Sequence, residues 1–467
     1  MSALMIQGAS SSAGKSLLTT ALARAFVRRG VDVVPFKGQN MSNNARVVHG
    51  GEIGTAQYLQ ALAAGIEPDV RMNPVLVKPE GDNQSQVVVL GRVDRRLSAL
   101  PWRERRGLWP IVSESLHALL TRHQLVLIEG AGSPAEINLR ETDLANMRVA
   151  KEADAAVALV ADIDRGGAFA HLYGTWALLP PDERALICGF ILNKFRGDAT
   201  LLPPAPERLE ELTGVPTLGV LPWLAHGLPD EDGVAPPRAR PRAPTVAIVR
   251  YPTASNLDEF KQLEQVADVR FAARPDDLDA IELLILPGSK HVAADLAWLR
   301  SSGLVDGLRA HIARGGRLLA ICGGLQMLGE RLTDNGGGEG DAVALGLLPL
   351  TTRFLPDKET RPTATRFLQL PDPWQPLSGL TFEGYEIRHG HSEPTDRVDA
   401  ALPDGLGYVS GPILAVYPHG LFEQPHLVEA LVACAPLRSL DEAFDVLADA
   451  VEAHLDIPSL LEKAGLS

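Results

Sequence analysis

The feature that most constrains the fold of this chain is a twofold alternation of short apolar runs with helical patterns, interrupted once by a proline-rich segment. Such alternation is the sequence signature of a parallel α/β sheet. The interrupting segment, residues 229–244 (PDEDGVAPPRARPRAP), holds five prolines and no apolar periodicity, which is typical of a semi-rigid linker. A chain of 467 residues has room for roughly two or three domains. We therefore expect two α/β domains in series.

The alternation also predicts where the elements and domains lie. The apolar runs that predict strands are residues 4–6, 31–36, 125–129, 155–161, 186–193, 245–250, 283–286 and 317–321. A helix is expected over 15–29, and helical spacing returns over 439–467, which we expect to cap the second domain. The predicted organisation is a first domain over 1–229, a linker over 230–244, a second domain over 245–438 and a C-terminal helical extension over 439–467.

Composition narrows the class of partner. Apolar residues make up 45% of the chain and charged residues 22%, close to the average of folded domains, so the chain is not disordered. Acidic residues (58) outnumber basic ones (44), which gives a net charge of −14. This surplus disfavours binding to nucleic acid or to an anionic membrane surface. Neither is therefore expected as a partner.

The cysteines and the apolar runs indicate a cytoplasmic location. Cys188, Cys322 and Cys434 are far apart and show no CxxC spacing, which disfavours a disulfide framework or a cysteine-based zinc site. The first residues, MSALMIQGAS, lack the basic and apolar regions of a signal peptide. Apolar stretches such as 342–350 are shorter than the ~18 residues of a membrane-spanning helix.

A glycine- and serine-rich segment, GASSSAGKS, joins the first expected strand to the first expected helix. Gly8 and Gly14 would let the loop turn so that its N–H groups face phosphate oxygens. Lys15 would reach the terminal phosphates and the Ser16 hydroxyl would hold Mg²⁺. The spacing between the glycines is one residue longer than in the usual P-loop. The alternative is a Gly/Ser turn before a surface helix.

Polar residues end three later strands of the first half. Glu129 closes LVLIE and could bind Mg²⁺, although an acid beside a turn without a ligand is an equally good interpretation. Asp162 ends the next strand, and Asn193 ends another, where its amide could contact an adenine. Ligands of open parallel sheets bind at such carboxyl ends.

In the second half, a cysteine lies between a predicted strand and a helix, in LLAICGGLQ. A sharp turn there would expose Cys322 as a nucleophile, and Gly323 would permit both the turn and the approach of substrate. The segment LPGSK, with Gly288, could add a second oxyanion-binding N–H to that of Gly323. The alternative is a buried structural cysteine, which is also the expectation for Cys188 and Cys434.

A cysteine nucleophile needs a base. His419, in AVYPHGLF, follows an apolar strand and lies beyond Cys322 in the chain. Its rivals are His291, His389 and His391.

Taken together, these motifs resemble those of the cobyric acid synthases, the glutamine-hydrolysing amidotransferases of cobalamin biosynthesis. The matching segments run nearly end to end: QGASSSAGKS, PFKGQNMSNN, MNPVLVKP, EGAGSPAEINL, DIDRGG, NKFRGD, LPGSKH, ICGGLQMLG, GYEIRHG and PHGLF. KGQNMSNN is the most specific, because it separates this branch from the cobyrinic acid a,c-diamide synthases. The resemblance implies a P-loop domain of dethiobiotin synthetase type with a parallel sheet, followed by a class I glutamine amidotransferase domain with a flavodoxin-like fold.

The resemblance also implies a reaction. Members amidate the b, d, e and g carboxylates of adenosylcobyrinic acid a,c-diamide, using L-glutamine, ATP and Mg²⁺. Cys322 and His419 would then be the glutaminase nucleophile and base, and Lys15, Ser16 and Glu129 would belong to the nucleotide and metal site. By the same likeness, Lys37 would stabilise the transferred phosphate and Asn193 would face adenine. By position alone, candidate partners for the substrate carboxylates are Arg46, Arg71 and Lys78, for which exposed, solvated roles are at least as good an interpretation.

One departure from the wider family matters. Class I amidotransferases commonly carry His-x-Glu, but this chain has Leu421 at that position. Either the site is a Cys–His dyad, or an orienting group comes from elsewhere.

Two other functions stay open at this point. One is a cobyrinic acid a,c-diamide synthase, and the other is a P-loop regulatory ATPase with an inactive hydrolase-like domain.

Overall fold

The computed structural model describes residues 2–81, 84–101, 104, 106–224, 228, 243–334, 339–432, 437 and 439–466. Contacts divide the chain into two units, Met1–His226 with Leu440–Ser467, and Gly227–Ser439. The C-terminal helices therefore belong to the first unit, and the expectation that they cap the second domain is wrong. Except for its last two residues, the predicted linker over 230–244 lies outside the described residues.

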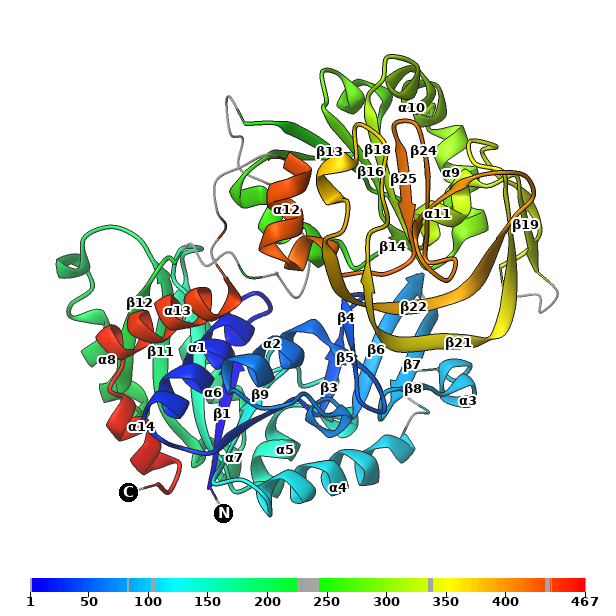
Figure 1. Ribbon diagram of the computed structural model, residues 1–467. Coiled ribbons are helices and arrows are strands. Elements are labelled where there is room, and N and C mark those ends of the chain that lie inside the picture. The colour runs from blue at the N-terminus through cyan, green and yellow to red at the C-terminus, as the bar shows by residue number, and fades with distance from the viewer. Residues whose placement is uncertain are drawn as a thin grey trace. The chain divides into compact units, whose positions relative to one another are not determined.

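The first unit is built on a six-stranded sheet whose strands all run parallel (Figure 1). In spatial order its strands are β12 (Thr217–Pro222), β11 (Ile187–Phe195), β10 (Ala156–Asp162), β1 (Ser2–Gly8), β9 (Leu125–Glu129) and β2 (Val33–Phe36). Apart from the half-buried edge strand β12, the strands are largely buried apolar runs, as expected of a parallel sheet covered by helices. The parallel α/β prediction is confirmed for this unit.

The direction of the chain through this sheet fixes where a ligand can bind. From β1 the chain passes through α1 (Lys15–Arg28) to β2, and from β9 it passes through α5 (Met147–Glu152) back to β10, on the other side of β1. Crossovers between parallel strands are right-handed, so these opposite directions place α1 and α5 on opposite faces of the sheet. The crevice where the order reverses lies beyond the carboxyl ends of β1, β9 and β10.

Further helices and two small sheets complete the unit. The helices are α2 (Thr55–Ala63), α3 (Arg95–Ser98), α4 (Trp109–Leu120), α6 (Ala168–Leu178), α7 (Pro181–Arg184) and α8 (Ala205–Thr213). One small sheet contains β3 (Gln39–Met41), β6 (Val75–Gly81), β7 (Gln84–Val89) and β8 (Arg92–Val93), and the other contains β4 (Ala45–Val48) and β5 (Gly51–Gly54). No strand was expected over 37–124, so these sheets are a finding of the structure.

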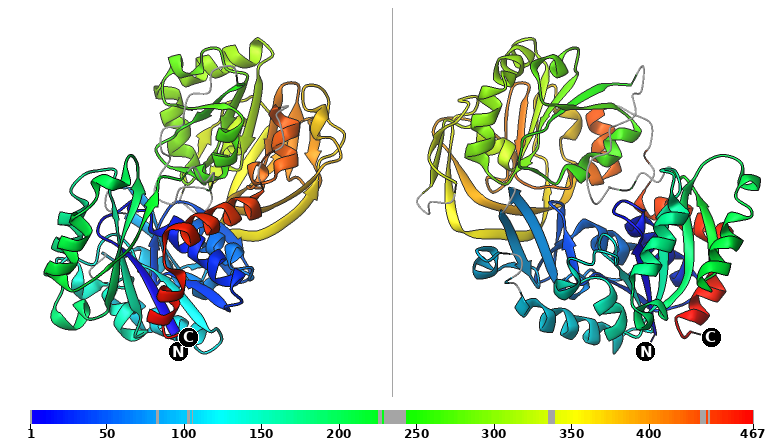
Figure 2. Two further views of the ribbon diagram at one scale, coloured as in Figure 1. Left: turned by 90° about the vertical axis from the view of Figure 1, so that its left-hand side faces the viewer. Right: turned by 180° about the vertical axis from the view of Figure 1, so that it is seen from behind.

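The C-terminal segment returns to the first unit as α13 (Leu440–His454) and α14 (Ile457–Lys463). Helix α13 packs on α1, and the two ends of the chain lie side by side, with a hydrogen bond from Ser2 to Gly465 (Figure 2). Apolar residues such as Phe444 and Leu447 are buried on α13. Its acids pair with arginines of α1, for example Asp445 with Arg24 at 2.7 Å.

The second unit is built on a seven-stranded sheet. In spatial order its strands are β15 (Asp268–Ala272), β13 (Thr245–Val249), β16 (Leu283–Leu286), β18 (Arg317–Ile321), β25 (Ile413–Val416), β24 (Gly407–Ser410) and β23 (Asp399–Leu402). The first five run parallel, and the last two are antiparallel additions. The strands expected at 283–286 and 317–321 have those bounds in the structure.

Helices and smaller strands surround this sheet. The helices are α9 (Val292–Ser301), α10 (Leu304–Ala313), α11 (Gly323–Leu328) and α12 (Pro425–Val432), with 3₁₀ segments η6 (Leu257–Gln265) and η9 (Leu421–Glu423). The additional strands are β14 (Ala254–Ser255), β17 (Gly288–Ser289), β19 (Arg331–Asp334), β20 (Ala342–Val343), β21 (Leu350–Arg366) and β22 (Thr381–Pro394). Strands β21 and β22 form a long antiparallel pair that borders α11.

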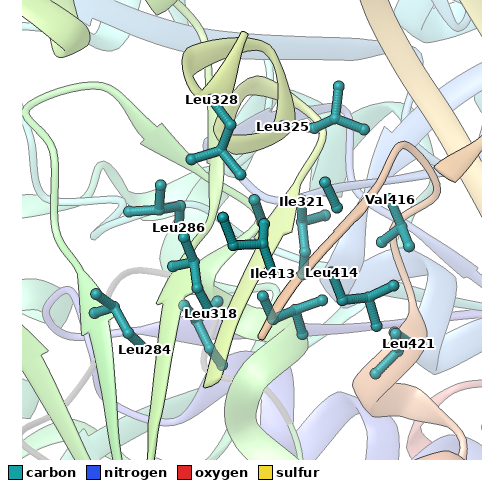
Figure 3. Packing of buried hydrophobic residues seen from close by; sticks show 14 of the residues in the cluster. Leu284, Leu286, Leu318, Ile321, Leu325, Leu328, Ile413, Leu414, Val416 and Leu421 are labelled. Carbon is teal, nitrogen blue, oxygen red and sulfur yellow. The ribbon is translucent and has the colours of Figure 1, made fainter. Parts of the chain in front are cut away.

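The core of this unit holds the turn after β18 in place. Figure 3 shows side chains of β16, β18 and β25 packed beneath two leucines of α11, Leu325 and Leu328. Each fully buried aliphatic side chain contributes about 1.5–3 kcal/mol, so the strand and helix on either side of the turn are firmly anchored.

In the described part of the chain, no helix has the length and apolarity needed to cross a bilayer.

Candidate active sites

The loop between β1 and α1 has the geometry of a phosphate-binding turn. Gly14 has φ 94°, and a Cβ there would lie 2.1 Å from the side-chain nitrogen of Asn193, so only glycine fits. A Cβ on Gly8 would lie 2.7 Å from the carbonyl oxygen of Ser10. The Lys15 ammonium is buried and donates to the carbonyl oxygens of Gly132 (3.2 Å) and Ser10 (3.4 Å). This geometry supports the nucleotide-binding interpretation of the longer glycine spacing.

Glu129, at the end of β9, gathers donors from three segments of the chain. One carboxylate oxygen accepts from the Ser16 hydroxyl and the Lys37 ammonium, both at 2.8 Å. The other accepts from the side-chain amides of Gln60 (2.5 Å) and Gln57 (3.4 Å) of α2. Glu129 and Lys37 are both buried, so the ion pair between them is shielded from solvent. A carboxylate beside a P-loop hydroxyl is a set of oxygen ligands that suits Mg²⁺ together with nucleotide phosphates.

Asn193 holds the P-loop. Its side-chain nitrogen donates to the carbonyl oxygen of Ala13 at 2.9 Å, and its oxygen accepts from the N–H of Lys194. Lys194 donates to the carbonyl oxygen of Ser12 (2.6 Å) and to Asp162 (3.0 Å). Contact of Asn193 with adenine stays a prediction, because these bonds already use one amide hydrogen and the oxygen.

The three basic residues considered for substrate carboxylates each have a partner within the protein. Lys78 pairs with Glu52 at 2.6 Å, and both side chains are buried. Arg71 pairs with Asp69 at 2.8 Å, and buried Arg46 donates to Thr55 at 3.0 Å. Each of the three side chains therefore has a hydrogen-bond or ion-pair partner without a substrate.

Cys322 occupies a strained turn between β18 and α11. Its φ of 50° and ψ of −105° lie outside the ordinary regions for a non-glycine residue, a feature that concentrates at functional sites. Its N–H bonds to the carbonyl oxygen of Val416 on β25 at 2.9 Å, which fixes the turn. Its Sγ lies 3.7 Å from the carbonyl oxygen of Ile387 on β22. The geometry is that of a nucleophile turn between a strand and a helix.

His419 lies next to this cysteine and is almost completely buried. Its Nδ1 is 2.9 Å from a carboxylate oxygen of Glu259, and its ring stacks on Tyr385 with centroids 5.5 Å apart. Burial lowers the pKa of His419, but the charge of Glu259 and hydrogen bonds with Cys322 and Glu259 outweigh this and raise it to about 10. The structure thus pairs Cys322 with an imidazole that favours its protonated form.

The two glycines expected to form the oxyanion site border this pair. A Cβ on Gly288 would lie 2.9 Å from Cε1 of His419, and a Cβ on Gly323 would lie 2.7 Å from the backbone nitrogen of Ser289. No side chain larger than hydrogen fits at either position. Their assignment as oxyanion donors stays a prediction that this proximity supports.

The competing histidines and cysteines have other surroundings. His389 is 3.3 Å from the carbonyl oxygen of Leu355, and His391 lies 4.0 Å from Glu393. Cys188 is half-buried on β11, and burial raises its pKa to about 11, which is unfavourable for a nucleophile. The predicted core position of Cys434 lies outside the described residues.

Family models match both units. Residues 4–227 match a CobQ/CobB/MinD/ParA nucleotide binding domain, and residues 245–427 match a CobB/CobQ-like glutamine amidotransferase domain. Relatives match along the whole chain. A cobyric acid synthase of Variovorax paradoxus (strain S110) is 53% identical over 97% of this chain and 97% of its own length.

The chain belongs to the cobyric acid synthase family. A second cobyric acid synthase, from Polaromonas sp. (strain JS666 / ATCC BAA-500), is 50% identical over 98% of this chain and 97% of its own length. A third, from Paracidovorax citrulli (strain AAC00-1), is 54% identical over 97% of each. As a member of the cobyric acid synthase family, the chain is an ATP-driven, glutamine-dependent amide ligase of cobalamin biosynthesis.

Sequence reasoning missed three polar residues of this cobyric acid synthase family member. Gln57 and Gln60 lie on α2, and their spacing of three residues, which puts both on one helix face, was the available signal. Glu259 lies 160 residues before His419 in the chain, and no local pattern connects the two.

Proposed function

We propose that this chain converts adenosylcobyrinic acid a,c-diamide into adenosylcobyric acid by amidating the b, d, e and g carboxylates, with L-glutamine as nitrogen donor and one ATP for each amide. The observation that carries the proposal is the contact of Cys322 with His419 in a strained turn. It occurs in a chain about half identical to cobyric acid synthases over its full length. An inactive hydrolase-like domain would have no need for this pair or for the strain at Cys322.

The first unit would activate the carboxylate. Lys15 and Lys37 would neutralise charge as the phosphoryl group passes from ATP to the substrate and forms an acyl phosphate. Ser16 and Glu129 would hold Mg²⁺, which supplies further charge neutralisation when bound. Lys37 now bonds to Glu129, so both groups are in place beside the P-loop hydroxyl.

The second unit would release ammonia. The Cys322 thiolate would attack the side-chain amide of glutamine, and the N–H groups of Gly288 and Gly323 would stabilise the oxyanion. The His419 imidazolium would donate its proton to the leaving nitrogen, and water would then hydrolyse the thioester to release glutamate. A reducing cytoplasm belongs to the proposal, because Cys322 must remain a thiol.

The test is mass spectrometry of the products formed from adenosylcobyrinic acid a,c-diamide, ATP, Mg²⁺ and glutamine. Four added amides support the proposal. No product from the a,c-diamide, but two amides added to cobyrinic acid itself, would assign the chain to the a,c-diamide synthases. ATP hydrolysis without any corrinoid product would favour a regulatory ATPase.

Two variants separate the two sites. Cys322→Ser should lose glutamine-dependent synthesis and retain synthesis from high concentrations of ammonia, whereas Cys188→Ser, the control, should retain both. Lys15→Ala should lose synthesis with either nitrogen donor. Ammonia-dependent synthesis in Lys15→Ala would contradict the P-loop assignment, and loss of both activities in Cys322→Ser would contradict the division into two sites.

A further inference from the structure

Glu259 is a buried carboxylate that contacts His419, the predicted base of the glutaminase site, and the residue that follows it. One of its oxygens lies 2.9 Å from Nδ1 of His419, and the other accepts the N–H of Gly420 at 2.9 Å. Both the acid and the imidazole are at most 2% exposed. A buried carboxylate is costly unless donors satisfy it, so this pairing fixes the histidine and its backbone together.

The segment that carries Glu259 is itself held rigidly. It belongs to η6, which begins after Asn256 with φ 52°. The next residue, Phe260, packs on Phe422 of η9 with ring centroids 5.0 Å apart. Segment η9 follows Gly420 directly, so the apolar contact and the carboxylate clamp join the same two pieces of chain. The acid therefore has little freedom to move away from the imidazole.

The clamp determines which nitrogen of the imidazole faces the nucleophile. With Nδ1 bound to the carboxylate, Nε2 is left for Cys322, which also hydrogen bonds to the ring. An Nδ1–H donated to a carboxylate fixes the tautomer and the plane of the ring and stabilises the imidazolium. The groups that face this imidazole are Glu259 from η6, Cys322 at the start of α11 and Tyr385 from β22.

We infer that Glu259 is the positioning carboxylate of the glutaminase site, and that it replaces the acid which related amidotransferases carry two residues after the histidine. That position is Leu421, whose apolar side chain is fully buried in the hydrophobic core and has no carboxylate to offer the imidazole (Figure 3). The role has moved from the segment after the histidine to a segment 160 residues earlier. This inference rests on the proposed function of the second unit.

The test compares Glu259→Gln, Glu259→Asp and Glu264→Gln in the full-length chain. Glu264 lies on the same η6 segment and pairs with Lys261 at 2.9 Å, so Glu264→Gln controls for the loss of an acid there. Glutamate release is measured against pH in the complete reaction, and ammonia-dependent amidation is measured in parallel. The latter activity reports on the first unit alone, so its absence in the wild-type chain would count against the proposed function and not against Glu259.

Glu259→Gln should lower kcat for glutamate release by about 10²–10⁴-fold, as loss of a carboxylate that orients a catalytic histidine does elsewhere. Its alkaline pH limit should move to lower pH, because the imidazolium loses its counter-ion. Glu259→Asp should restore part of kcat and move the alkaline pH limit part of the way back. Glu264→Gln should match the wild-type chain in both quantities. An unchanged kcat, or a fall in kcat with the pH limit unmoved, would overturn the inference.

A spectroscopic measurement covers the case in which Glu259→Gln fails to fold. In the wild-type chain with ¹⁵N-labelled histidine, His419 should show a strongly downfield Nδ1–H signal, assigned by its absence in His419→Gln. The signal should shift in Glu259→Asp and persist in Glu264→Gln. Its absence from the folded wild-type chain would refute the role of Glu259.

Discussion

The C-terminal helix α13 is held on the first unit by two kinds of contact that mutation can separate. Phe444 and Leu447 are buried on one face of the helix. Asp445 of the same helix pairs with Arg24 at 2.7 Å and with Arg28 at 2.9 Å. Since α13 packs on α1, and α1 begins at Lys15, this attachment supports the helix that carries the P-loop lysine.

The magnitudes predict that the apolar contact dominates. Phe444→Ala removes a fully buried aromatic ring, which costs about 3–5 kcal/mol when the cavity cannot collapse. The Asp445 side chain is 40% exposed, and exposed ion pairs contribute about 0.2–1 kcal/mol each. Asp445→Asn should therefore cost at most about 2 kcal/mol for its two pairs. Its cost should also shrink at high salt, whereas that of Phe444→Ala should not.

The assay is urea unfolding followed by tryptophan fluorescence, with and without ATP. Two units need not unfold together, so a single transition is not assumed. The transition that ATP moves to higher urea belongs to the first unit, because a ligand stabilises only the unit that binds it. Phe444→Ala should lower the midpoint of that transition at least about 1.5 times as much as Asp445→Asn does.

Two results would refute this reasoning. If Phe444→Ala lowered only the transition that ATP does not move, the C-terminal helices would belong with the second unit after all. If Asp445→Asn cost as much as Phe444→Ala at high salt, charge and not burial would hold the helix.

Two further predictions concern the two sites, and a third concerns the stability of the second unit. Gly14→Ala should weaken ATP binding at least about tenfold in calorimetry, because a left-handed alanine costs roughly 1–2 kcal/mol and its Cβ has no room. Gly30→Ala, with φ 79° but nothing within 4 Å, should leave ATP binding unchanged. Gly384→Ala would put a Cβ 2.1 Å from the carbonyl oxygen of His419, the proposed base, so glutamate release should fall sharply while ammonia-dependent synthesis persists. Burial raises the pKa of Glu386, but the hydrogen bond and charge of Arg388 outweigh it, and the folded pKa lies below 4.5. The carboxylate thus stabilises the fold above about pH 4.5, and this contribution is lost as pH falls through the folded pKa. Glu386→Gln should accordingly be less stable than the wild-type chain at pH 7, with a difference that shrinks in acid, as thermal unfolding across that range would measure.

Local patterns were sufficient for the strands and turns that carry the two sites. The strand that ends at Glu129 and the strand that precedes Cys322 have the predicted bounds. A short run of aliphatic residues between polar turns is compatible with few structures other than a buried strand. The predicted helix after the P-loop begins at Lys15 as expected. The glycine-rich loop and the strained cysteine turn were predictable because their residues are consecutive in the chain.

The partner of the C-terminal helix was not predicted, although a signal for it existed. Apolar spacing shows that a helix has a buried face but not which surface covers that face. Asp441, Asp445 and Asp449 recur at four-residue intervals, as do Arg24 and Arg28. Two helix faces of opposite charge and equal period are complementary, and the structure pairs them.

The buried acid that the sequence predicted and the buried acid that it did not predict are stabilised in the same way. Glu129 and Glu259 are both fully buried carboxylates, and each is tolerated only because donors from distant segments converge on it. Lys37 lies 92 residues from Glu129, and His419 lies 160 residues from Glu259. Glu129 was predictable because it ends a recognisable strand, whereas Glu259 lies in an irregular segment with no periodic signal. Each of these two buried acids marks a point where the fold must bring separate segments together, and in each unit that point is the proposed site of chemistry.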